Sequence, residues 1–110
     1  MKNYKMPGEN ITLPAPAAVL SGQAQLIGVI FGVAQFDASA GETCVYVRRG
    51  VFVLPKTSAQ AWTAGVKIYW DDTNKVATTT ASGNTLIGAA AAAAANPSAA
   101  GDVLLDGVIR

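Results

Sequence analysis

The sequence contains no histidine and only one cysteine among its 110 residues. Histidine is the commonest general base in catalysis and a frequent metal ligand, so the serine–histidine and cysteine–histidine pairs of nucleophilic enzymes are excluded. A single cysteine excludes an intramolecular disulfide and a zinc site built from cysteines alone. Because Cys44 lies in the strand-like run Thr43–Val47, we expect a small buried apolar residue rather than a reactive thiol.

Acidic residues are few, and none of them is arranged for chemistry. The chain has seven, and all lie in or beside expected turns, where a carboxylate can accept hydrogen bonds from its own backbone. The adjacent pair Asp71-Asp72 lacks the further oxygen ligands that a calcium loop needs. No glycine-rich phosphate loop ending in Gly-Lys-Ser or Gly-Lys-Thr is present. We therefore expect a protein that is not an enzyme and that has no cofactor, no metal site and no small-molecule substrate.

Net charge and long apolar runs are also lacking. Eight basic residues balance the seven acidic ones, so the sequence has no basic stripe of the kind that binds nucleic acid. The longest apolar run, Leu86–Ala95, has ten residues, which is too short to span a bilayer. The N-terminus lacks the apolar segment of a signal peptide. We expect neither a membrane nor a nucleic acid among the partners, and a protein that acts in a cytoplasm or inside an assembly.

What the sequence does contain is a series of short strand-like segments separated by turn residues. About eight of them recur at roughly ten-residue spacing, which is typical of a β-sandwich or a small barrel. The sequence therefore predicts an all-β fold, a small β-barrel or β-tulip-like sandwich, as a single domain over residues 10–110. Residues 1–9 show no periodicity and contain the breaker Pro7-Gly8, so we expect an extended N-terminal arm.

Two stretches carry the clearest strand signals. Val66–Trp70 and Lys75–Thr80 flank a short polar loop, which predicts a β-hairpin. The β-branched stretch Gln23–Ala34 is too long for one flat strand, so we expect the chain to bend at Gly28 and Gly32.

Helical signals are confined to two places. Ser58–Gly65 predicts one short helix, with a serine as N-cap and a glycine as terminator, and Trp62 on this helix is expected to cover one end of the barrel. The seven alanines Ala89–Ala95 have high helix propensity. However, they follow a strand-like run and precede Asn96-Pro97, and they offer no larger apolar residue to anchor a helix. Strand and helix both stay open for this run, and we favour a strand.

One group of residues supports an alternative function. Aromatic side chains beside arginines on a barrel face can stack nucleic-acid bases. The near-zero net charge weakens this alternative, and two of the aromatic residues lie between aliphatic ones, as core residues do. The group consists of Tyr46, Arg48, Arg49 and Phe52, with Tyr69 and Trp70 in a nearby strand.

The order of segments along the chain resembles a known family, the capsid cement or head decoration proteins of tailed phages and prophages. No single motif is diagnostic, but their order and spacing cover nearly the whole chain. The alanine run with residues 96–98 departs from the family pattern, where larger or charged residues are usual. The matching segments are residues 1–4, 8–13 with the Pro/Ala segment after them, 21–22, 27–29, 31–34, 40–42, 50–56, 65–71 followed by Lys75-Val76, and 83–88.

The resemblance implies a β-barrel or β-tulip-like fold, assembly as a homotrimer, and binding of the major capsid protein on the outside of an expanded icosahedral shell. The protein would then be made in the host cytoplasm and finish on the capsid exterior. The N-terminal arm is a candidate for capsid contact by strand addition, through Lys2, Asn3, Tyr4 and Lys5. The alternatives are a tail or baseplate module of the virion and the nucleic-acid-binding barrel described above.

Overall fold

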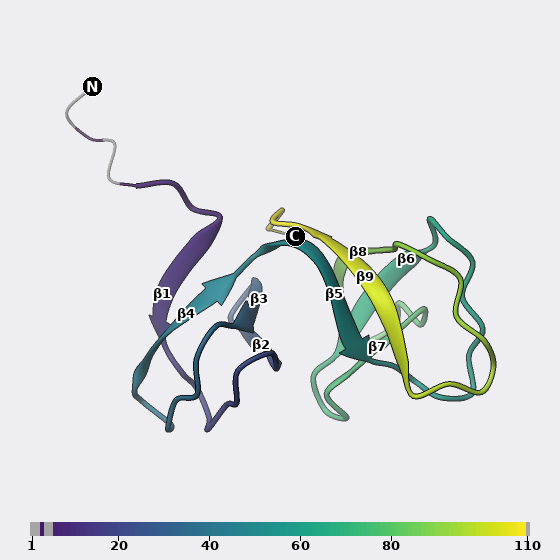
Figure 1. Ribbon diagram of the computed structural model, residues 1–110, viewed down its shortest axis with the longest axis horizontal. Coiled ribbons are helices and arrows are strands. Elements are labelled where there is room, and N and C mark those ends of the chain that lie inside the picture. Colours follow the sequence, from purple (N-terminus) through teal and green to yellow (C-terminus); the bar gives the residue numbers. More distant parts are fainter. Residues whose placement is uncertain (1–2, 4–5, 110) are drawn as a thin grey trace.

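The computed structural model describes residue 3 and residues 6–109, and in this part of the chain it contains strands and turns but no helix. The strands form two antiparallel sheets that lie side by side (Figure 1). The first sheet has the order β1 (Asn10–Pro14), β4 (Thr43–Val47), β3 (Ile30–Ala34), β2 (Ala24–Ile27). The second has the order β5 (Arg49–Pro55), β9 (Ala100–Asp106), β8 (Thr85–Ala90), β6 (Lys67–Asp71), β7 (Val76–Thr78). The all-β prediction is confirmed.

Of the two predicted forms, a barrel and a sandwich, the described residues do not form a closed barrel. The chain passes from β4 directly into β5, and this crossing divides the strands between two separate sheets. The edge strands of the second sheet approach each other through a single parallel bridge between Lys56 and Ala77, where the Thr57 N–H donates to the Ala77 carbonyl at 3.0 Å. One bridge does not make a continuous ladder, so this sheet is strongly curved but not closed.

Alternation along the strands builds two hydrophobic clusters. In β9, for example, Val103 and Leu105 point inward and are buried, whereas Leu104 points outward. The larger cluster lies under the second sheet and also receives residues from β2 and β3 of the first sheet, namely Ala24, Leu26, Phe31 and Val33. The smaller cluster lies under the first sheet and its loops and contains Cys44 and Tyr46. The predicted burial of Cys44 is confirmed.

The predicted helix over residues 58–65 is wrong. The segment instead makes two turns around an isolated bridge, in which the backbones of Trp62 and Ala94 exchange hydrogen bonds of 2.9 and 3.0 Å. These long-range bonds use the Trp62 amide that a helix would need internally. The Trp62 side chain is buried against Gly101 in the larger cluster, so it packs in the core instead of covering a barrel end.

The alanine run is neither a helix nor a complete strand. Ala89 and Ala90 complete β8, and residues 91–95 form bends interrupted only by the bridge at Ala94. The strand that we favoured for this run is therefore correct for its first two residues. Because alanine has a short side chain, the exposed part of the loop leaves little apolar surface in water.

The predicted hairpin and one of the two predicted bends are confirmed. β6 and β7 pair across residues 72–75, and Asp71 Oδ1 accepts the amides of Thr73 and Asn74 in the turn. Gly28 has a φ of +62° in the turn between β2 and β3. Gly32 does not bend the chain but lies within β3. A Cβ atom there would lie 2.8 Å from the Tyr46 Cβ, so this glycine permits close strand packing.

Candidate functional surface

Residues 6–9 of the predicted arm lead into β1 (Figure 1). Of the four residues predicted to contact a capsid, Asn3 is described and is exposed, whereas Lys2, Tyr4 and Lys5 lie outside the described residues. Residues 6–9 are also exposed and form no strand. The described part of the predicted arm therefore presents its side chains to solvent.

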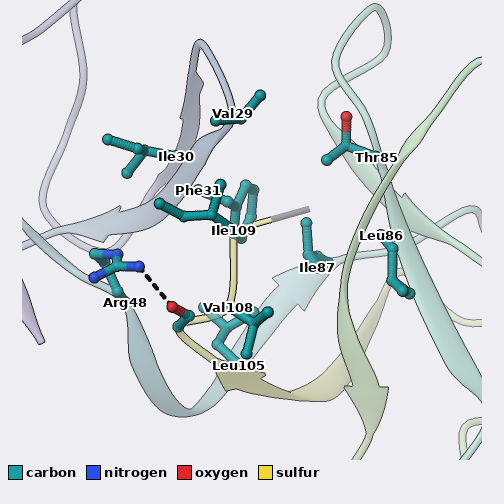
Figure 2. Close-up of a pocket in the computed structure, with 11 residues that line it drawn as sticks. Val29, Ile30, Phe31, Arg48, Thr85, Leu86, Ile87, Leu105, Val108 and Ile109 are labelled. Carbon is teal, nitrogen blue, oxygen red and sulfur yellow. Dashed lines mark hydrogen bonds between the residues drawn. The ribbon is translucent and has the colours of Figure 1, made fainter.

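Two arginines at the junction of the sheets anchor the base of this segment. Arg48 lies between β4 and β5, and its guanidinium donates from Nη1 to the Gly8 carbonyl and from Nη2 to the Gly107 carbonyl, as Figure 2 shows for the second bond. The neighbouring Arg49 Nη1 lies 3.2 Å from Glu9 Oε1. Since a guanidinium donates in two directions at once, Arg48 ties the N-terminal and C-terminal segments to the same point.

β1 is an open edge of the first sheet. The backbone amide of Arg48 donates to the backbone carbonyl of Glu9, and that of Ala15 donates to the backbone carbonyl of Glu42. Because bonding alternates along an antiparallel strand, the odd-numbered residues of β1 are the ones whose backbone groups bond β4. The backbone groups of Asn10 and Thr12 therefore point to the open side, where an added strand can pair with them. Pro14 has no N–H and ends this run of free groups.

The structure does not assemble the predicted nucleic-acid-binding group. Tyr46 and Trp70 are 1% and 2% exposed, so their rings have no face free for stacking a base. The Tyr46 hydroxyl donates to Gln25 Oε1, and burial, with a smaller contribution from Cys44, raises the pKa of this tyrosine above 10.0. Arg48 and Arg49 engage the anchor described above, while Phe52 and Tyr69 are half-buried.

The outer face of the second sheet carries an unusual concentration of exposed apolar side chains. Val51 and Val53 point outward from β5 and are 57% and 68% exposed, and Leu104 points outward from β9 and is 46% exposed. Val51 pairs with Leu104, and Leu104 pairs on its other side with Ala89 of β8. These four residues form one continuous surface, which we term the outer patch.

Two hollows lie between the sheets. The first, shown in Figure 2, lies between the β2–β3 turn and the C-terminal segment, and its free volume of about 10 Å³ is enough for little more than one water molecule. The second is a groove of about 630 Å³. Its walls are mostly apolar, and its two charged residues, Asp72 and Lys75, pair with each other at 2.7 Å. Neither hollow gathers a nucleophile with a base.

A buried lysine is one feature that the sequence pattern does not indicate. Lys56 is 3% exposed, and its ammonium donates to backbone carbonyls of the two loops that flank it. The ammonium also lies 5.7 Å from the centroid of the Trp62 ring. Lysine is seldom fully buried, so the residue type gives no indication of this position. The accepting carbonyls belong to Thr57 at 3.0 Å, Ser58 at 3.5 Å, Ala95 at 3.4 Å and Ser98 at 3.3 Å.

Metal-ligating side chains do not cluster in the described part of the chain. No group of three or more histidine, cysteine, aspartate or glutamate residues there lies close enough to hold a metal ion. Over the same residues, no helix has the length and apolar character needed to cross a membrane.

Comparison with known proteins defines the class. A family model described as phage cement protein matches residues 5–105, which is almost the whole chain. The match identifies a structural component of a phage capsid. The chain belongs to the phage cement protein family, as the order of its segments indicated. No curated protein and no solved structure matches it.

Proposed function

We propose that this protein binds the outer surface of the expanded capsid as a homotrimer, at the junctions between copies of the major capsid protein, and stabilises the shell. The family match over residues 5–105 is the observation that carries this proposal. A capsid has local three-fold points where subunits meet, and a three-fold protein presents the same surface to each of them. A protein that binds only the assembled, expanded state stabilises that state by mass action.

The N-terminal segment and β1 supply the capsid contact in this proposal. The segment's described residues, Asn3 and 6–9, are exposed, and Arg48 and Arg49 contact Gly8 and Glu9 beside the sheet junction. An extended segment can add a strand to the edge of a partner sheet, and the open side of β1 can accept one. We place Lys2, Asn3, Tyr4 and Lys5 in this contact.

Co-sedimentation tests the proposal. Purified protein is mixed with expanded and with unexpanded capsids of the parent phage, and the protein that pellets with each is quantified. We expect saturable binding to expanded capsids only. A truncation lacking residues 1–6 leaves the contacts of Arg48 and Arg49 with Gly8 and Glu9 in place. It is expected to bind at least tenfold more weakly while keeping its thermal midpoint, and undiminished binding by this truncation would refute the role of the arm.

A further inference from the structure

The outer patch of an isolated subunit exposes apolar side chains to water. A sheet with one face packed on a core normally alternates apolar inward and polar outward residues. β5 and β9 depart from this pattern, because Val51, Val53 and Leu104 point outward beside one another (Figure 1 shows the two strands side by side). Contiguous exposed apolar side chains of this kind mark protein-binding surfaces.

Charges of both signs border the patch. Lys67 extends the cross-strand row Val51–Leu104–Ala89 at the β6 side and is exposed. Asp102 lies directly opposite Val53 on β9, and its neighbours at 101 and 103 are buried, so its side chain points to the outer face. The ion pairs within the described residues join other groups, Arg49 with Glu9 and Lys75 with Asp72. Lys67 and Asp102 therefore border the patch, and neither has an ion-pair partner among the described residues.

We propose that the outer patch is the contact between subunits of the homotrimer, and that one side of the patch binds a different side of the patch on a second copy of this chain. Charge complementarity favours a second copy over the capsid shell as the partner. The border of the patch carries both a positive and a negative side chain, so a rotated copy can place its negative side chain opposite the positive one. In a ring, each subunit uses one side of its patch against a different side of the patch on the next subunit. Lys67 of one copy then faces Asp102 of its neighbour across a centre formed by Val51, Val53 and Leu104.

This inference rests on the trimeric state in the proposed function and names the surface that produces it. It leaves the N-terminal segment and β1 free for the shell. The two surfaces belong to different sheets, so a substitution in one is expected to leave the other intact.

Charge exchange tests the contact. The mass of the full-length protein is measured by light scattering and sedimentation for the wild type, Lys67→Asp, Asp102→Lys and the double exchange. We expect the wild type at three times the 11.2 kDa chain mass. Each single exchange is expected to weaken association roughly thirtyfold or more, and the double exchange to restore it. Val53→Glu is expected to give a monomer, whereas Phe36→Glu, at a comparably exposed apolar residue outside the patch, is expected to stay trimeric.

Capsid co-sedimentation of the same variants separates this inference from the proposed function. Monomeric variants that keep circular-dichroism spectra of the wild type but bind expanded capsids less tightly support it. A wild-type monomer, or trimers that persist in Val53→Glu, would overturn it. Trimeric variants that lose capsid binding would also overturn it, because the patch would then face the shell. Failure of the wild type to bind any capsid refutes the proposed function and leaves the measured subunit contact standing.

Discussion

The rings of Phe31 and Trp70 contact each other across the two sheets, with centroids 5.0 Å apart and planes tilted by 56°. Phe31 belongs to β3 of the first sheet and Trp70 to β6 of the second. A tilted aromatic pair at this distance stabilises beyond the area it buries. The pair therefore contributes to the packing of the two sheets against each other.

Phe31→Ala is expected to lower the free energy of unfolding by about 2–4 kcal/mol, because it removes this contact and leaves a cavity at the joint between the sheets. Chemical denaturation followed by tryptophan fluorescence measures the change. Phe36→Ala is the matched control, since that ring is 56% exposed, and its effect is expected to stay within about 0.5 kcal/mol. Equal effects of the two substitutions would show that the joint does not depend on the pair.

Lys56→Met is expected to destabilise the protein by about 2–4 kcal/mol. The substitution keeps a long side chain but removes the buried ammonium that joins the 57–58 and 95–98 loops through hydrogen bonds to their carbonyls. Lys75→Met serves as the control, because its exposed pair with Asp72 contributes about 1 kcal/mol or less. Thermal and chemical unfolding measure both variants. Similar losses in the two would mean that the ammonium of Lys56 does not hold the loops.

Gly88→Ala is expected to be among the most damaging single-methyl additions to this chain. A Cβ atom at this position would lie 2.0 Å from the backbone oxygen of Leu104, so β8 and β9 would have to separate. We expect a loss of at least about 3 kcal/mol, seen as a fall in thermal midpoint of more than about 10 °C. Gly8→Ala adds the same methyl group 3.5 Å from Arg48 Nη1 and is expected to be nearly neutral. A normal midpoint for Gly88→Ala would contradict the observed strand spacing.

Acid is expected to weaken the β6–β7 hairpin through Asp71. Hydrogen bonds from the side chain and backbone of Asn74, and then from the backbone of Thr73, lower the pKa of Asp71 below its ordinary value of 3.8. A lowered folded-state pKa contributes stability that is present above the unfolded pKa and is lost as the pH falls through the folded one. Titration of the Asp71 carboxyl by NMR measures the shift. In Asp71→Asn, the acid-dependent loss of stability is expected to be smaller, and a pKa at or above 3.8 would contradict this account.

Features set by residues close in the chain were predictable from the sequence. The β6–β7 hairpin, the turn at Gly28 and the burial of Cys44 all follow from local alternation and turn residues. Ser58–Gly65 has local helix signals, but Trp62 pairs with Ala94 more than thirty residues later, and local propensity carries no information about that pairing.

The arrangement of the sheets depended on contacts that spacing alone does not specify. The strand spacing left a barrel and a sandwich open, and it does not reveal that the chain crosses at Arg48 from one sheet to the other. Of the arm residues, the described Asn3 is exposed, and contact of the arm with a capsid stays a prediction. The outer patch could not be predicted, because Val51 and Val53 have the residue type that is usual in any strand. Only the pairing of β5 with β9 shows that they lie on the outer face.

The most direct test of the account is the resistance of expanded capsids to heat or to osmotic shock, measured with and without added wild-type protein. We predict that capsids bind the protein to saturation at their three-fold junctions and release their DNA at a higher temperature when it is bound. Expanded capsids that bind none of the protein, or that bind it without any gain in stability, would contradict a role as a capsid cement.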